Sequence, residues 1–224
     1  MVTNTKNMAK KQLTSEEITQ IANDLQSKQS AKRRSAAKKI RKNQLIQLGD
    51  DLYKAYIKER EDKRTWETQT EMILAFGRIG YSGIEGDLRL IIDKNEPHDM
   101  ITIAAARSYV RLKRKSLSDA EPVIELLKNG NLSVLNGATD ILTFDDMHPS
   151  EEQIKAIISL LDSKNEKDIS IRGLGDPREG LLSAMSKWKD AVSQSYLERF
   201  NKSDNQLLRK CAELALKGKK SVFE

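Results

Sequence analysis

Apolar residues recur every three or four positions along most of the chain, which is the spacing of one face of an α-helix. The pattern is clearest in two stretches, Thr65–Gly80 (TWETQTEMILAFGRIG) and Met100–Leu112 (MITIAAARSYVRL), each with small residues at its centre. A more acidic amphipathic stretch precedes each of them. Clusters of Val, Thr and aromatic residues, which favour strands, are few. The sequence therefore predicts an all-α protein built from pairs of helices.

Several of these helices are expected to begin with a capping box. In that motif a side-chain oxygen and a carboxylate or amide three residues later satisfy free amides of the first turn. The sequence predicts such starts at Thr14, Ser118, Ser150 and Asp176, with partners Glu17, Glu121, Gln153 and Glu179. Pro177 follows Asp176, at the first helical position, where proline is favoured.

The second helices of the pairs can be aligned on one small residue. The aligned residues are Ala37, Ala75, Ala106, Ala138, Ala184 and Ala212. Their average spacing, about 35 residues with two helices in each unit, is typical of a solenoid. Each unit of a solenoid has an apolar face that only a neighbouring unit buries. The alternative is an irregular helical bundle, and the periodicity favours a solenoid of about six antiparallel helix pairs.

The units RRSAAKKI, ETQTEMILAFGRIG and TIAAARSYVRL resemble the HEAT-repeat family of armadillo-like solenoids, and the resemblance covers roughly residues 14–217. It implies a curved right-handed superhelix with the first helices on the convex side and the second helices lining the concave side. Members of that family mostly bind proteins. Some relatives bind DNA, including a group of alkylpurine glycosylases, whose catalytic residues cannot be matched to positions here.

Composition is consistent with one elongated helical domain. Of the 224 residues, 38% are hydrophobic and 32% are charged. We expect a disordered basic tail over 1–13, a HEAT-like repeat domain over 14–218 and a C-terminal tail over 219–224. The single cysteine, Cys211, and the lack of an apolar N-terminal or membrane-spanning run predict a cytoplasmic protein without membrane contact.

Charge separates between the two kinds of helix. Basic minus acidic residues total −9 over the expected first helices and +13 over the second, within a net charge of +6. If the second helices line the inside, this predicts a basic groove, because a cleft of one sign attracts the opposite charge. The alternative is that these charges only solubilise and pair the helices. The candidate partner-binding residues are Arg33, Arg34, Lys38, Arg41, Lys42, Arg107, Arg111, Arg114, Arg178 and Trp188.

Arg178 and Trp188 are candidates because they cluster around the longest connection, residues 163–176, and long ordered loops often contact ligands. No catalytic, metal-binding or cofactor-binding constellation is found. His98 and His148 stand next to prolines, with no second ligand at metal spacing. The sequence therefore predicts a non-enzymatic scaffold, a monomer or weak oligomer, that holds a protein partner with an acidic surface. The alternative is a protein that binds the DNA or RNA backbone, at the extreme a glycosylase-like HEAT protein.

Overall fold

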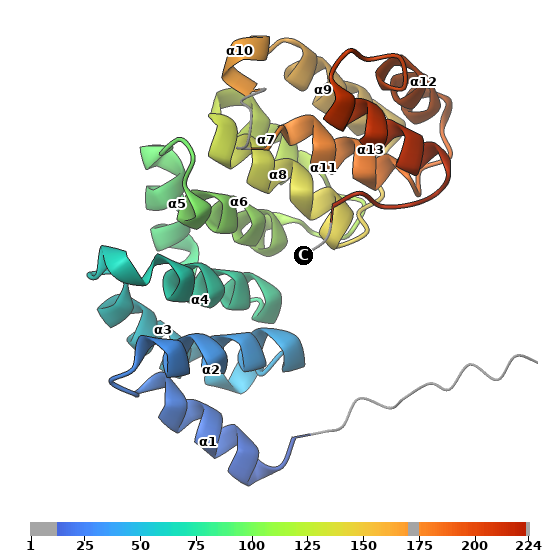
Figure 1. Ribbon diagram of the computed structural model, residues 1–224. Helices are drawn as coiled ribbons and strands as arrows, with labels where there is room; N and C mark the ends of the chain where they lie inside the picture. Colours follow the sequence, from blue (N-terminus) through green and yellow to red (C-terminus); the bar gives the residue numbers. More distant parts are fainter. Residues whose placement is uncertain (1–12, 170–174, 223–224) are drawn as a thin grey trace, which may run out of the picture.

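The computed structural model describes residues 13–169 and 175–222, and within these ranges all regular structure is helical. The helices form two layers (Figure 1). The first-helix layer consists of α1 (Ser15–Leu25), α3 (Gly49–Glu59), α5 (Glu85–Lys94), α7 (Glu121–Asn129), α9 (Glu151–Asp162) and α12 (Ala191–Phe200). The second-helix layer consists of α2 (Ser30–Asn43), α4 (Trp66–Ile79), α6 (Met100–Lys113), α8 (Leu132–Phe144), α11 (Pro177–Met185) and α13 (Gln206–Leu216). The predicted all-α solenoid of paired helices is confirmed.

Short helical turns complete the chain path. They are the 3-10 turns η1 (Ile46–Leu48), η2 (Lys63–Thr65) and η3 (Ser82–Ile84), and the single turn α10 (Glu166–Ile169). Each of the 3-10 turns leads directly into an α-helix, which lets the chain reverse over a few residues. α10 stands between α9 and α11, inside the long connection that the sequence marked out.

Three of the four predicted capping boxes are present. The hydroxyls of Thr14 and Ser150 and the carboxylate of Asp176 accept hydrogen bonds from backbone amides of the first turn. In each case the side chain three residues later accepts a hydrogen bond from the backbone amide of the capping residue. The prediction at Ser118 is wrong. Its hydroxyl lies 2.9 Å from that of Ser116, and α7 begins three residues later behind Ala120, without a side-chain cap. Asp119 accepts from the amide of Glu121 and takes the position that the sequence assigned to Ser118.

The second helices stack on one another along their length, whereas the first helices contact each other much less. Small residues permit this close approach. The six aligned alanines are all buried, at 4% exposure or less. Gly137 lies against the backbone of Ile103, where an added Cβ would come within 2.5 Å of the carbonyl oxygen. Buried hydroxyls also join neighbouring second helices, since Ser108 Oγ donates to the Ile73 carbonyl at 2.8 Å.

Tighter stacking of one layer bends the solenoid towards that layer. In Figure 1 the stack curves, and the right-hand, C-terminal ends of α2, α4 and α6 lie on the inside of the bend. Basic residues occupy the last turn of each of these three helices. The curvature therefore gathers basic residues that are about one repeat apart in the sequence.

The end of the chain returns to the second-helix layer. Lys220 Nζ donates to the Thr143 carbonyl of α8 at 2.7 Å and lies 2.8 Å from Asp146 Oδ1. The amides of Ser221 and Val222 both donate to Ser183 Oγ of α11, at 3.0 and 3.2 Å. Residues 219–222, expected to belong to a tail, are thus bound to the fold. The expected N-terminal tail lies outside the described residues, apart from Leu13, which packs against the core.

Candidate binding surface

A hollow of about 450 Å³ on the inside of the bend is lined, among the described residues, almost entirely by cations. We call it the basic pocket, and its lining residues are Lys38, Arg41, Lys42, Gln44 and Arg78. The first four come from the end of α2 and its cap, and Arg78 comes from the last turn of α4. Cations are favoured near helix C-termini because the free carbonyls there carry partial negative charge.

The pocket contains three candidates from the sequence, Lys38, Arg41 and Lys42, and one residue that the sequence analysis missed. Arg78 stands two residues before Gly80, the left-handed cap that ends α4. Aligning the second helices on their C-terminal ends, rather than on their small residues, would have identified it. The pocket exists only because α2 and α4 stack with these ends side by side.

Two candidates in the first half of α2 lie outside the pocket and have acidic partners. Arg33 forms an ion pair with Glu59 of α3 and donates to the Ser27 carbonyl at 2.7 Å. Glu59 is buried, and burial alone would raise its pKa, but hydrogen bonds from Arg33, Ser30 and Thr65 hold the pKa below its usual value. Arg33 therefore stabilises the fold of the first two repeats.

Arg34 is the other candidate in that half of α2. It pairs with Glu67 of α4, and 32% of its side chain remains exposed. It differs from Arg33 because its partner is itself half exposed, so the pair is accessible to solvent and contributes little to stability.

The three candidate arginines at the end of α6, Arg107, Arg111 and Arg114, are paired with carboxylates inside the protein. Arg107 forms an ion pair with Asp140 and lies over the Phe144 ring, 4.7 Å from its centroid. Arg111 and Arg114 both bind the carboxylate of Asp145, with shortest distances of 2.8 and 2.6 Å. The three arginine side chains are only 15%, 2% and 15% exposed. The expectation that Arg107 and Arg111 are exposed groove cations is therefore wrong.

Asp145 links three second helices through one carboxylate. Besides Arg111 and Arg114 it contacts Arg78, whose Nη1 lies 3.2 Å from Oδ1. Burial alone would raise the pKa of Asp145, but the neighbouring Arg111 and Arg114 outweigh it and hold the pKa below its usual value. Asp140 in α8 and Asp145 at its end thus compensate arginines of the repeats before them.

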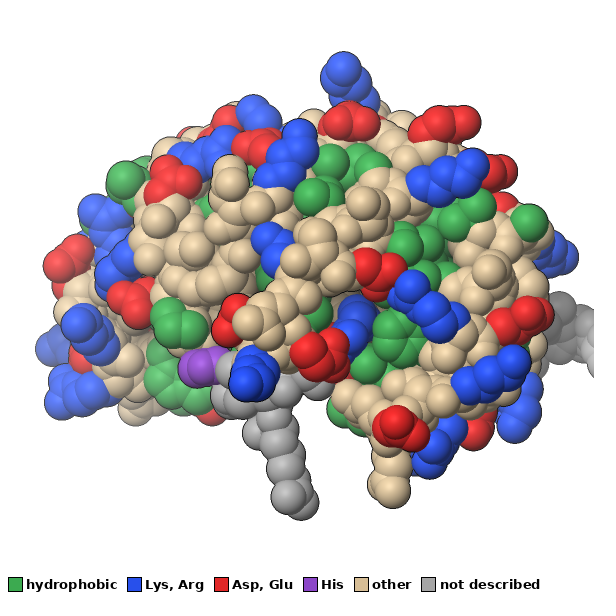
Figure 2. Space-filling model, turned by 90° about the horizontal axis from the view of Figure 1, so that it is seen from above, with side chains coloured by type: hydrophobic (Ala, Val, Ile, Leu, Met, Phe, Trp, Pro, Cys, Tyr) green, Lys and Arg blue, Asp and Glu red, His purple; other side chains and the backbone are tan. Residues whose placement is uncertain are grey.

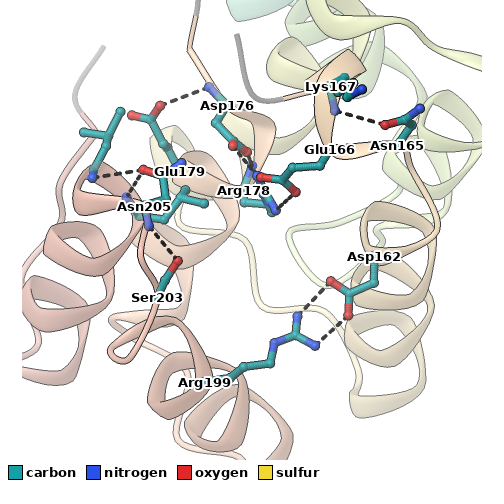
Figure 3. Close-up of polar contacts among 12 residues, drawn as sticks. Asp162, Asn165, Glu166, Lys167, Asp176, Arg178, Glu179, Arg199, Ser203 and Asn205 are labelled. Atoms are coloured by element: carbon teal, nitrogen blue, oxygen red, sulfur yellow. Dashed lines mark hydrogen bonds and ion pairs between the residues drawn. The ribbon is translucent and has the colours of Figure 1, made fainter. Parts of the chain in front are cut away.

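Arg178 lies away from the basic pocket, between α10 and α11 (Figure 3). Its guanidinium contacts Asp176 and Glu166, with an Nη2–Oε1 distance of 2.7 Å to the latter. Burial alone would lower its pKa, but the two carboxylates outweigh this and raise it. Arg178 therefore ties the long connection to the start of α11. Of that connection, 170–174 lie outside the described residues.

Trp188 follows α11 and is partly buried. Its indole nitrogen donates to the carbonyl of Met147 at 2.8 Å, which ties the end of α11 to the turn after α8. The indole also lines a hollow of about 450 Å³ beside Asp190 and Gln194. The structure therefore separates Trp188 and Arg178 from the basic residues of the N-terminal half.

The end of the stack seen from above carries both signs of charge. Figure 2 shows Lys and Arg side chains interspersed with Asp and Glu, with no broad area of one sign. Basic residues of the C-terminal half also pair with acidic ones, since Lys187 and Lys220 both lie within 3 Å of the Asp146 carboxylate.

A larger hollow, of about 780 Å³, lies between the second and third helix pairs. Its lining mixes both charges with apolar groups, including Trp66, which is 45% exposed, and Leu90, which is 71% exposed. Arg60 and Asp87 form an ion pair across its wall. Unlike the lining of the basic pocket, the lining of this hollow carries both signs of charge.

Within residues 13–169 and 175–222, no group of three or more His, Cys, Asp or Glu side chains is arranged to hold a metal ion. None of the helices described combines the length and apolar character that crossing a membrane requires.

No protein family model matches this chain. No curated protein matches it either. Among solved structures, it is similar to a designed armadillo repeat protein in complex with the peptide (KR)4, at 16% identity and a TM-score of 0.40. The match covers 90% of this chain and 99% of the designed one. A likeness this distant carries no argument about binding.

Proposed function

We propose that this protein is a non-enzymatic, HEAT-like scaffold of the cytoplasm that holds a protein partner with an acidic surface on the inside of its bend. The observation that carries this proposal is the basic pocket, where four cations from two helices line one hollow without an acidic lining residue among those described. Several cationic side chains that line one hollow favour an anionic group there, because such a group can accept several charge-assisted hydrogen bonds.

The internal pairing of Arg107, Arg111 and Arg114 favours a protein partner over the nucleic-acid alternative. A nucleic-acid backbone presents evenly spaced phosphates, and its binding depends on many cations along a path. Here the central arginines are engaged by Asp140 and Asp145. These arginines therefore do not continue the basic pocket as a track of exposed cations along the second helices.

A capture experiment from an extract of the native host tests the proposal. It compares the parent protein with two doubly substituted variants, Lys38→Gln/Lys42→Gln in the basic pocket and Lys54→Gln/Arg64→Gln outside it. Both variants lose two positive charges, and Lys54 and Arg64 are highly exposed, at 70% and 89% of their side chains.

We expect acidic proteins to be enriched by the parent and by the outer variant, and lost from the pocket variant. Equal capture by all three proteins would contradict the proposal. Loss of the captured material on nuclease treatment would instead favour the nucleic-acid alternative.

A further inference from the structure

The hollow of about 780 Å³ between the second and third helix pairs is separate from the basic pocket. We call it the inter-repeat hollow. Its walls include Trp66 in the first turn of α4, Leu90 of α5 and Ile101 in the first turn of α6. The basic pocket, in contrast, is formed by the C-terminal ends of α2 and α4. The two sites therefore lie at opposite ends of the second helices.

Large apolar side chains are exposed at the inter-repeat hollow. Trp66 and Leu90 both line it and are exposed to solvent. Met100, also exposed, comes directly before the lining residue Ile101. Single exposed apolar residues are common on protein surfaces, whereas several gathered at one concave surface mark an interaction site.

Two buried polar side chains of the hollow are already paired within the protein. Gln69 Nε2 donates to the carbonyls of Glu59 and Asp62, at 3.2 and 2.9 Å. Thr102 Oγ1 donates to the carboxylate of Asp99 at 2.6 Å. These groups do not need a polar ligand. What a ligand gains here is the removal of apolar surface from water.

The charged residues around the hollow are of both signs. Arg60 forms an ion pair with Asp87, and Lys94 Nζ lies 3.1 Å from Glu96 Oε1. Nucleic acids and anionic lipid surfaces are bound by clusters of Lys and Arg. A protein segment carries charges of both signs and can complement a mixed rim. Charge complementarity therefore favours a protein segment as the occupant.

The size of the hollow indicates how that segment enters. A cavity of about 150 Å³ is enough for one benzene ring, and the hollow has about 780 Å³. Several apolar side chains are needed to fill it, all from the same side. A helix presents residues i, i+3, i+4 and i+7 on one face, whereas successive residues of an extended segment point in opposite directions. A helix therefore suits the hollow better than an extended segment.

We infer that the inter-repeat hollow is a docking site for an amphipathic helix of a partner protein, whose large apolar side chains contact Trp66 and Leu90. This goes beyond the proposed function, because the basic pocket takes no part in it. The residue types that contribute most to binding at protein interfaces are Trp, Tyr and Arg. The hollow supplies all three, as Trp66, Tyr56 and Arg60.

The test is a selection from a phage-displayed library of random peptides, each long enough for about four helical turns. The parent protein is immobilised, and the Leu90→Gln variant is added in excess in solution to remove peptides that bind elsewhere. We expect the enriched peptides to carry large apolar residues at i, i+3 or i+4, and i+7. They should bind the parent about tenfold or more tighter than Leu90→Gln, because the variant loses the apolar contact of a leucine side chain.

Matched variants locate the site. Ile46→Gln is the control, since Ile46 is 69% exposed, compared with 71% for Leu90, and is not part of the lining. It should leave peptide binding unchanged, as should Lys38→Gln/Lys42→Gln in the basic pocket. An unchanged melting temperature shows that Leu90→Gln is folded. Bound peptide should also move the tryptophan emission to shorter wavelengths, and Trp66→Phe should lose this change.

Three results would overturn the inference. The first is a selection that yields no peptide able to distinguish the parent from Leu90→Gln. The second is enrichment of peptides with apolar residues at every other position, the spacing of an extended segment. The third is self-association of the parent that Leu90→Gln abolishes, which would show that a second copy covers the hollow. The scaffold proposal is judged separately, by the capture experiment with the basic-pocket variant.

Discussion

Arg111 of α6 and Asp145 at the end of α8 form a two-point ion pair between neighbouring repeats, with Nε–Oδ2 at 3.0 Å and Nη2–Oδ1 at 2.8 Å. Only 2% of each side chain is exposed. Removing either partner of such a pair costs more stability than the pair contributes on balance. The reason is that the remaining charge is left buried without its partner.

We therefore predict that Asp145→Asn destabilises the protein by about 3–5 kcal/mol, the usual cost of removing one partner from a buried ion pair. Urea unfolding followed by circular dichroism measures this change. Asp146→Asn is the matched control, since Asp146 is 43% exposed and its loss should cost about 0–1 kcal/mol. Similar values for the two variants would show that Asp145 does not hold the buried arginines.

The same carboxylate predicts a pH dependence. Because the folded-state pKa of Asp145 lies below its unfolded value of about 4, its contribution is complete above pH 4 and is lost as the pH falls through the folded pKa. The difference in unfolding free energy between the parent and Asp145→Asn should therefore shrink below about pH 4. A difference that stays constant from neutral pH down to the acid limit of folding would contradict the assigned pKa direction.

Close stacking of the second helices predicts opposite effects for two glycine substitutions. In Gly137→Ala the new Cβ would lie 2.5 Å from the Ile103 carbonyl oxygen and 2.7 Å from the Cβ of Ala106. We expect destabilisation by about 1–3 kcal/mol, the cost of overpacking. In Gly86→Ala no atom lies within 4 Å of the new Cβ, so the helix should gain about 0.5–1 kcal/mol. Thermal or urea unfolding distinguishes the two signs.

The returning end of the chain depends on one buried hydroxyl. Ser183→Ala removes the acceptor of the Ser221 and Val222 amides, so we expect these amides to exchange with solvent at least several-fold faster. Hydrogen exchange followed by mass spectrometry measures this. Exchange in α4 and α6 should not change. Unaltered exchange of residues 219–222 would mean that Lys220, not Ser183, holds the segment.

Most of the architecture could be predicted from local signals. The aligned alanines, from Ala37 to Ala212, predicted the second helices and their buried faces, because close packing of helices requires small residues at fixed intervals. Capping boxes at Thr14, Ser150 and Asp176 predicted helix starts, since the motif is satisfied within four residues. The start at Ser118 failed because Asp119 competes for the same role.

The candidate surface could be predicted only in part. Sequence identified the basic composition of α2 and the positions of Lys38, Arg41 and Lys42. It did not identify Arg78, whose contribution depends on which residue of α4 comes beside the end of α2. It also overestimated the exposure of Arg107 and Arg111. Their acidic partners, Asp140 and Asp145, come from the next repeat, 33 and 34 residues away.

The sequence by itself determined the helices, their pairing and the sign of charge on each, because helical periodicity, caps and composition act within a few residues. Only the tertiary structure decided which of those charges are buried against a charge of opposite sign. Stacking of α6 on α8 brings arginines within hydrogen-bond distance of carboxylates and buries them. Stacking of α2 on α4 brings cations together without an acidic residue in the lining described. Charge compensation depends on distance in space, and in a solenoid that distance is set by packing between repeats.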